Sequence, residues 1–416
     1  MNRLFLALLL CCSAYSASFF TPIPPARAEE RCAAGVPLNG DIPPATTFGS
    51  SRASGAGITV AVIDTGVAPH PQLRDLIAGS DLVSPESPNP LSDCDAHGTI
   101  VAGIIASTDR GIAPRSRILS IRQTSSTSAH VDDVSRAQGS LASLAQAISE
   151  AVDRGARVIN VSVVACLPPE RARHVNTRVL DAALHHAEQR GVVVVAAAGN
   201  RSPQCQDSSV VYPAHSPTVV SVGALDDPHD LAAYSLAGGA NILSAPGRVT
   251  AGLDPRGPGW ITAVGTPDTS GFVASPQELI GTSFAAPVIS GIIALLLEQH
   301  PEYAPAQVRA HLFSVAQPPH GAIATDDVLS ARIPPAPPAR TLPVLSCPSA
   351  PDPRAQSHTR IFVLSLGLAV LCAGLAGGFA ARYLPSRFRS SPERSREQNH
   401  GTGELPTTKA GVGHPS

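Results

Sequence analysis

The stretch ITVAVIDTGV, residues 58–67, joins a short apolar run rich in β-branched residues to an aspartate and a glycine turn. A run of this length and composition, bounded by turn residues, is typical of a strand buried on both faces of a sheet. Asp64 stands where that strand would end, and active sites of α/β sheets gather at the carboxyl ends of their strands. An isolated Asp-Thr-Gly is more often a turn whose aspartate caps the next segment. The role of Asp64 therefore depends on what the rest of the chain supplies.

Strand-length apolar runs alternate with helical patterns along the chain. Four further runs resemble the first: Ile118–Ile121, Val158–Val163, Val192–Ala197 and Val219–Val222. Helical spacing of apolar residues recurs in Ser140–Arg154 and Asn176–Arg190, and Gly155 and Gly191 follow them as the expected C-caps. Strand–helix alternation implies right-handed crossovers and parallel strands. The sequence predicts an α/β fold in three layers, with a mainly parallel sheet flanked by helices.

A histidine with a distinctive setting follows in DAHGTIVAG, residues 95–103. His97 is one of 14 histidines, most of which we expect to be solvated or structural. A Gly-Thr pair comes directly after it, and the small residues of Val101–Gly103 favour the start of a helix packed closely on the sheet. We expect the His97 side chain near a helix N-terminus and within reach of Asp64, because a buried carboxylate needs a partner.

The serine of GTSFAAPVISG, residues 281–291, precedes a long apolar stretch. Ser283 at the start of a buried helix would expose its hydroxyl on a rigid element and aim backbone N–H groups at a developing oxyanion. Pro287 is expected in the first turn of that helix, where no backbone donor is needed. A simple N-cap serine fits the same geometry but leaves the glycines unexplained. Asn200, in AAAGN after a predicted strand, could add an amide donor, although Asn after Gly is ordinarily a turn signal.

An acid, a base and a hydroxyl nucleophile are the parts of an acyl-transfer site, in which the carboxylate orients the imidazole and the imidazole takes the serine proton. Asp64, His97 and Ser283 stand in that order, each in its own glycine-bearing context. This constellation predicts a serine protease. An esterase would instead carry a G-x-S-x-G elbow, which Ala285 breaks at its last position.

The composition suits a folded protein and sets limits on its partners. The chain is 43% hydrophobic, with 30 basic residues, 32 acidic residues and a formal charge of −2. A nucleic-acid binder would normally carry a basic stripe, so we expect no nucleic-acid partner.

The N-terminus has the pattern of a secretory signal peptide over residues 1–28. Arg3 precedes the apolar run Leu4–Cys12, and Ala26-Arg27-Ala28 offers a small-x-small cleavage site. The run is too short to span a bilayer. A buried N-terminal helix is the alternative, which the proline-rich stretch before the cleavage site disfavours. Residues 29–50 are then expected to be an N-terminal extension of the mature protein.

The C-terminal part predicts a membrane anchor. The globular domain, 51–331, is followed by a proline-rich linker, 332–359, which favours an extended semi-rigid spacer. The uncharged apolar run within 360–382 is long enough for a transmembrane helix. Five arginines lie at its end and beyond it: Arg382, Arg387, Arg389, Arg394 and Arg396. The positive-inside rule places the tail, 383–416, in the cytoplasm and the domain outside, and the polar composition of the tail predicts disorder.

Together, the four blocks ITVAVIDTGV, DAHGTIVAG, AAAGN and GTSFAAPVISG resemble the Asp, His, Asn and Ser blocks of the subtilisin-like serine proteases, or subtilases, over residues 58–298. The resemblance implies a subtilisin-like fold and peptide-bond hydrolysis through an acyl-enzyme. It also implies a triad of Asp64, His97 and Ser283, with Asn200 as oxyanion donor. One departure is Asn160–Val164, which stands where the family often has a Ser-Leu-Gly strand beside the substrate. The shape of the specificity pocket is therefore expected to differ.

With the secretory start, the linker, the span and the cysteines, the chain is most similar to mycosins, the membrane-anchored subtilases that accompany type VII secretion systems. That resemblance implies an extracytoplasmic endopeptidase with protein or peptide substrates, held in the cell membrane beside a type VII secretion membrane complex. The alternative from a different class is a structural component that stabilises such a complex, with proteolysis secondary.

The cysteines suit an oxidising compartment. Five lie outside the signal peptide and the span: Cys32, Cys94, Cys166, Cys205 and Cys347. Four cysteines allow three pairings, which the sequence alone leaves open. The resemblance to mycosins implies Cys32–Cys94 and Cys166–Cys205. A zinc site is the rival, but no CxxC pattern supports it, and no carboxylate cluster indicates calcium, so we expect no metal and no cofactor.

Overall fold

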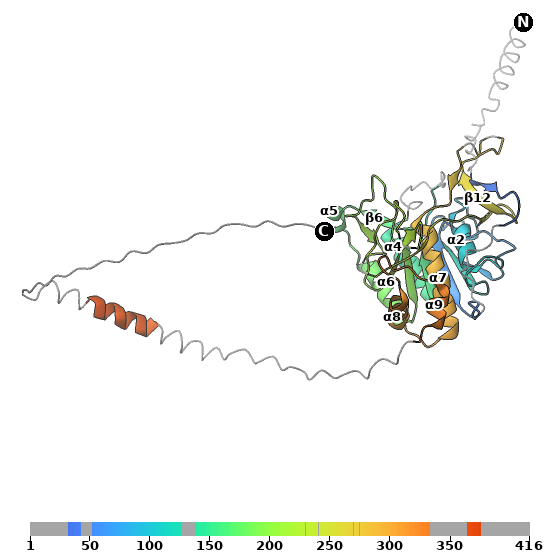
Figure 1. Ribbon diagram of the computed structural model, residues 1–416. Coiled ribbons are helices and arrows are strands. Elements are labelled where there is room, and N and C mark those ends of the chain that lie inside the picture. Colours follow the sequence, from blue (N-terminus) through green and yellow to red (C-terminus); the bar gives the residue numbers. More distant parts are fainter. Residues whose placement is uncertain are drawn as a thin grey trace, which may run out of the picture. The chain divides into compact units, whose positions relative to one another are not determined.

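The computed structural model describes residues 32–42, 52–126, 139–228, 230–239, 241–268, 270–273, 275–332 and 364–375. The chain divides into two units, 1–335 and 336–416, which we describe separately. All of the described ranges except the last lie in the first unit, whose ribbon is shown in Figure 1.

A seven-stranded sheet forms the centre of the first unit, in the order β10-β9-β7-β5-β2-β4-β3, and every neighbouring pair is parallel. Its strands are β2 (Thr59–Asp64), β3 (Leu76–Asp81), β4 (Arg117–Arg122), β5 (Val158–Val161), β7 (Val193–Ala197), β9 (Val220–Leu225) and β10 (Ile242–Pro246). The predicted parallel sheet is confirmed. The two edge strands, β3 and β10, were not among the predicted strands, because both mix polar residues, glycine or proline with their apolar residues.

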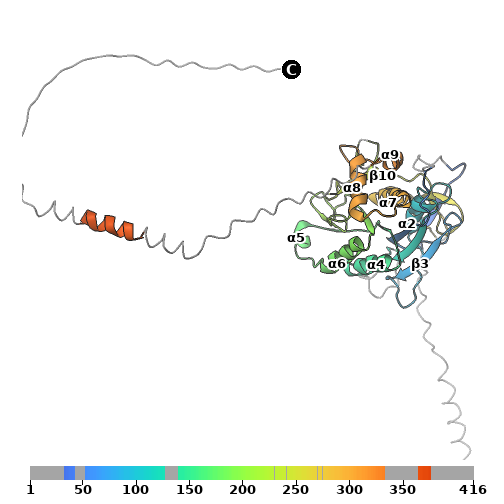
Figure 2. The same cartoon turned by 90° about the horizontal axis from the view of Figure 1, so that it is seen from below.

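Successive residues of each inner strand pack on opposite faces of the sheet. Val60 and Val62 of β2 belong to the core beneath α2 (His97–Ala106) and α7 (Thr282–Gln299), whereas Ala61 and Ile63 pack toward the other two helices. Those two helices are α4 (Leu141–Asp153) and α6 (Arg178–Gln189). Figure 2 shows α4 and α6 on one side of the unit and α7, α8 (Pro305–Val315) and α9 (Thr325–Ser330) on the other. The predicted three layers are confirmed.

The ends of α4 and α6 follow the expected pattern. Gly155 and Gly191 come just after these helices with φ of +80° and +76°, the left-handed conformation that glycine adopts without a Cβ penalty. The predicted C-caps are confirmed.

Helix α7 is apolar on all sides because it is buried on all sides, against α2 and the strands β5, β7, β9 and β10. The prediction for Pro287 was wrong. The helix begins at Thr282, so Pro287 lies in the second turn, where it removes a main-chain donor.

Two small antiparallel sheets flank the main one. In the first, β1 (Ala34–Pro37) and β11 (Gly252–Leu253) pair with β12 (Trp260–Gly265), which also pairs with β13 (Gln277–Glu278). In the second, β6 (Ala165–Leu167) pairs with β8 (Val210–Tyr212), beside the short helix α5 (Pro169–Ala172). The described part of the N-terminal extension is therefore an integral strand of the domain.

Both disulfides have the pairing that the resemblance implies. Cys32 joins Cys94, and Cys166 joins Cys205. The first bond joins Cys32, two residues before β1, to the loop that leads into α2, where Cys94 lies three residues before His97. Cys347 lies outside the described residues.

In the second unit the structure describes one apolar helix, Leu364–Leu375, whose apolar side chains are exposed. It lies within the predicted span 360–382, the rest of which is outside the described residues. Among the described residues, one helix is both long and apolar enough to cross a bilayer, Thr282–Gln299, and it is α7, 83% buried within the domain. The transmembrane helix stays a prediction, as do the signal peptide, the linker and the tail.

Candidate active site

Asp64 is the last residue of β2 and is fully buried. Its Oδ1 accepts hydrogen bonds from the backbone N–H of Thr65, at 2.8 Å, and from His97 Nδ1, at 2.7 Å. Because the strand ends here, the carboxylate projects from the carboxyl edge of the sheet, where the sequence placed it. Its charge is partnered rather than isolated.

His97 is the first residue of α2 and joins the acid to the serine. With Nδ1 on Asp64, its Nε2 lies 2.9 Å from Ser283 Oγ. The preceding residue, Ala96, has a φ of +67°, an uncommon value for a non-glycine residue that turns the chain sharply into the helix. Gly98 follows because a Cβ there would clash with the carbonyl oxygen of Gly66. The glycine after the histidine thus lets α2 approach the end of β2.

The electrostatic setting raises the pKa of His97. Burial by itself would lower this pKa, but the charge of Asp64 and its hydrogen bond act in the opposite direction and prevail, with smaller contributions from Asp93 and Asp95. A histidine of raised basicity is suited to accept a proton from a neighbouring hydroxyl.

Ser283 lies in the first turn of α7, at the point where that buried helix meets the cleft. Gly281 precedes it by two residues. A Cβ on Gly281 would lie 3.1 Å from Ser283 Oγ and 3.2 Å from Asn200 Nδ2. Glycine therefore keeps open the space between the hydroxyl and the amide.

The amide of Asn200 is oriented by its own oxygen. Oδ1 accepts hydrogen bonds from the backbone N–H and from the hydroxyl of Thr282, both at 3.0 Å. The Thr282 hydroxyl in turn accepts from the backbone N–H of Gly199, at 3.1 Å. With the oxygen occupied in this way, Nδ2 faces the open space over Gly281 and is positioned as a donor beside Ser283.

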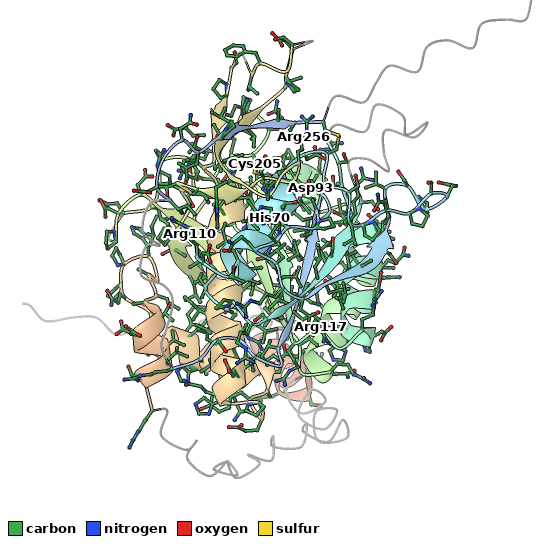
Figure 3. All side chains as sticks on the ribbon, turned by 90° about the vertical axis from the view of Figure 1, so that its right-hand side faces the viewer. His70, Asp93, Arg110, Arg117, Cys205 and Arg256 are labelled. Carbon is green, nitrogen blue, oxygen red and sulfur yellow. A yellow bond between two sulfur atoms is a disulfide. The ribbon has the colours of Figure 1, made fainter. Side chains whose placement is uncertain are left out.

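The sequence did not predict a role for Asp93, whose carboxylate accepts hydrogen bonds at the start of α2. This buried carboxylate accepts from the Thr65 hydroxyl at 2.8 Å, and from the backbone N–H and hydroxyl of Thr99 at 2.7 and 2.6 Å. Burial raises its pKa to about 6, against the opposing effect of these hydrogen bonds. Figure 3 shows Asp93 in the upper part of the view, well apart from Arg117. The Asp93 residue is 7% exposed. An acidic residue in a loop gave no signal that it would be buried.

An open cleft of about 510 Å³ is bordered by His97, Asn200 and Ser283. One wall is formed by the residues that follow β5, Ser162, Val163 and Val164, and another by Thr124, Ser125 and Ser126. Strand β5 ends at Val161 rather than at the predicted Val163. The hydroxyl of the next residue, Ser162, donates to the carbonyl oxygen of Ser283. Three residues of the stretch that departs from the family pattern therefore lie in the wall of the cleft, namely Ser162, Val163 and Val164.

This fold and this arrangement of side chains are those of a serine protease, and comparison with known proteins agrees. The model of the subtilase family matches residues 55–333, and the chain belongs to that family.

Among curated relatives, Mycosin-4 of Mycobacterium tuberculosis is 36% identical over 362 residues, covering 77% of this chain and 77% of that protein. Subtilisin BL of Lederbergia lenta is 31% identical over 268 residues, covering 63% of this chain and 84% of that protein. The chain is thus similar to mycosins over most of its length, and to Subtilisin BL over a shorter part.

Solved structures give the same result. A structure of MycP3 protease from the type VII (ESX-3) secretion system has a TM-score of 0.61 and 34% identity, covering 72% of this chain and 91% of that chain. A chain of an intact ESX-5 inner membrane complex has a TM-score of 0.64 and 32% identity, covering 84% of this chain and 94% of that chain.

Proposed function

We propose that the protein is a serine endopeptidase whose triad is Asp64, His97 and Ser283, with Asn200 as oxyanion donor. The observation that carries this proposal is the continuous line from carboxylate to imidazole to hydroxyl, with separations of 2.7 and 2.9 Å. A free-standing serine hydroxyl is a weak nucleophile, and an adjacent, oriented base is what activates it.

The reaction follows from these positions. As Ser283 Oγ attacks the scissile carbonyl carbon, its proton passes to His97 Nε2, and the imidazolium is stabilised by Asp64. The carbonyl oxygen becomes an oxyanion, which accepts hydrogen bonds from Asn200 Nδ2 and from the backbone N–H of Ser283. Collapse of this intermediate breaks the C–N bond, and His97 gives its proton to the leaving amine. Water, deprotonated by His97, then hydrolyses the Ser283 ester, releasing the acid and restoring the hydroxyl.

Internal cleavage of an unfolded protein tests this function. We expect the full-length protein, purified in detergent, to generate new N-termini within the substrate. The cleft is open, so the middle of a polypeptide can enter it and not only a chain end. His97→Ala should abolish these products, whereas His186→Ala should not, since His186 lies on α6, with Asp153 as partner. Mass spectrometry of the fragments gives the answer. Products released only from substrate termini, or equal cleavage by His97→Ala, would contradict the proposal.

We further propose that the protein is anchored by residues 360–382, with the protease domain outside and 383–416 in the cytoplasm. The supporting observations are the uncharged apolar run and the arginines that follow it. Protease added to intact cells should digest the domain but spare a tag fused after Ser416. Loss of the tag from intact cells would refute this orientation.

The likeness to a chain of the ESX-5 inner membrane complex supports a partner of the same kind, a type VII secretion membrane complex. It also favours the second candidate function, stabilisation of such a complex. Replacing the chromosomal copy with the Ser283→Ala variant separates the two. If deleting the gene dissociates the complex, normal assembly with the variant assigns the stabilising role to the fold alone, and dissociation with the variant makes that role depend on proteolysis. A complex that survives the deletion would contradict the stabilising role.

A further inference from the structure

The hydrogen-bond ladder of α7 has a gap at the candidate nucleophile. In an α-helix, the N–H of residue 287 would donate to the carbonyl oxygen of residue 283. Residue 287 is proline and has no N–H, so the Ser283 carbonyl loses its partner within the helix. The side chain that follows β5 directly replaces that partner: Ser162 Oγ donates to the Ser283 carbonyl oxygen at 2.9 Å.

Ser162 is itself held by a buried chain of hydrogen bonds. Its hydroxyl accepts from Asn160 Nδ2 at 2.8 Å, and Asn160 Oδ1 accepts from Ser290 Oγ at 2.9 Å. Asn160 and Ser290 are fully buried, and Ser162 is 5% exposed. Every polar side-chain atom of the three therefore has a partner. Buried networks in which every polar group has a partner hold their side chains in one arrangement. Breaking one hydrogen bond would leave a buried polar group without either a protein or a water partner, which is costly in free energy.

The network ties Ser283 to the strand that lies between the other functional groups. Asn160 belongs to β5 and pairs in register with Val62 of β2 on one side and Val195 of β7 on the other. Strand β2 ends at Asp64, and Asn200 follows β7. The network thus ties the position of Ser283 to a strand that pairs directly with β2, which ends at Asp64, and with β7, which Asn200 follows.

We propose that Ser162, supported by Asn160 and Ser290, is a positioning residue for the reaction. By supplying the donor that Pro287 lacks, it holds the main chain of Ser283 so that Oγ faces His97 Nε2 and the N–H faces the oxyanion site. This inference rests on the proposed role of Ser283. Misplacement of a reacting group by about 1 Å costs roughly 10²-fold in rate, which sets the size of the expected effect.

A double-mutant comparison tests the proposal. Ser162→Ala should lower kcat by roughly 10²-fold with KM little changed, since the loss is one of alignment. In a Pro287→Ala background, the new N–H of residue 287 can donate to the Ser283 carbonyl. The same Ser162→Ala change should then cost only a few-fold. Measuring the loss in both backgrounds cancels any effect of Pro287→Ala by itself.

Two other roles for Ser162 give different results. Ser162 also borders the cleft, so a role in holding substrate would raise KM equally in both backgrounds. A purely structural role would lower the unfolding temperature and leave kcat of the folded protein intact. Either result overturns the proposal. Ser162→Thr, which keeps the hydroxyl, covers the case in which Ser162→Ala does not fold. It should stay within a few-fold of the native kcat, and a 10²-fold loss would contradict the proposal.

The matched control is Ser149→Ala. The Ser149 hydroxyl also donates to a main-chain carbonyl, that of Ala145 at 2.9 Å, but within α4. Its kcat should equal that of the native protein. Fluorophosphonate labelling of the native protein separates the two levels of inference. Absence of an adduct on Ser283 removes the proposed function, whereas an adduct on Ser283 with no effect of Ser162→Ala removes the positioning role alone.

Discussion

Ser283→Ala should lower kcat for peptide hydrolysis by roughly 10⁶-fold, because it removes the atom that forms the ester. What remains would be the contribution of binding and of the oxyanion donors. The Ser283 hydroxyl makes its side-chain hydrogen bond to His97 Nε2, so the variant should fold normally. Steady-state hydrolysis of a chromogenic peptide measures the loss, and near-UV circular dichroism checks the fold.

The matched control for that variant is Ser330→Ala in the last turn of α9, where the hydroxyl donates to the Asp326 carbonyl. It should retain full activity. Hydrolysis by Ser283→Ala at more than about one-hundredth of the native rate would contradict the assignment, because a triad without its nucleophile does not retain such activity.

Asp64→Asn should lower kcat by roughly 10⁴-fold at neutral pH. The carboxylate Oδ1 accepts from His97 Nδ1, which fixes the tautomer that leaves Nε2 free to take the serine proton. An amide at this position can present its NH₂ group to Nδ1 and select the wrong tautomer.

The same substitution should shift the pH dependence. In the proposed mechanism, activity requires neutral His97, and the pH dependence of kcat/KM reports the pKa values of the free enzyme. Because Asp64 helps to hold the pKa of His97 above its ordinary value of 6.5, the acid limb of the native enzyme should have its midpoint above pH 6.5. Removing the negative charge favours the neutral imidazole, so the midpoint for Asp64→Asn should lie at lower pH.

Asp75→Asn serves as the control, since Asp75 is half-exposed and pairs with Arg117. It should leave both kcat and the midpoint unchanged. A midpoint for Asp64→Asn at or above the native one would mean that Asp64 does not set the basicity of His97.

The parts of the fold that the sequence predicts are those governed by local periodicity. The inner strands are continuously apolar, and α4 and α6 repeat at helical spacing, so both kinds of element follow from composition. The motifs include the residue that ends β2 and the residue that begins α2. Asp64 and His97 therefore lie in the structure at the strand end and the helix start where the sequence predicts them.

What the sequence could not give depends on contacts between distant residues. Ser162 and Ser283 are 121 positions apart, and neither residue's surroundings in the chain indicate that their groups meet. We predicted Pro287 in the first helical turn because proline is favoured there. The hydroxyl that replaces its missing donor in the second turn belongs to Ser162, the residue after β5. Asp93 likewise looks like an ordinary loop acid until Thr65 and Thr99 enclose it.

Labelling with a fluorophosphonate probe tests the central claim most directly, because the probe forms a stable bond with an activated serine and mimics the tetrahedral intermediate. We expect one adduct per chain, mapped by mass spectrometry to Ser283, and none in Ser283→Ala. In Asn200→Ala the reaction should be roughly 10²-fold slower, since the probe oxygen loses one donor. An unlabelled native protein, or an adduct on any residue other than Ser283, would contradict the account.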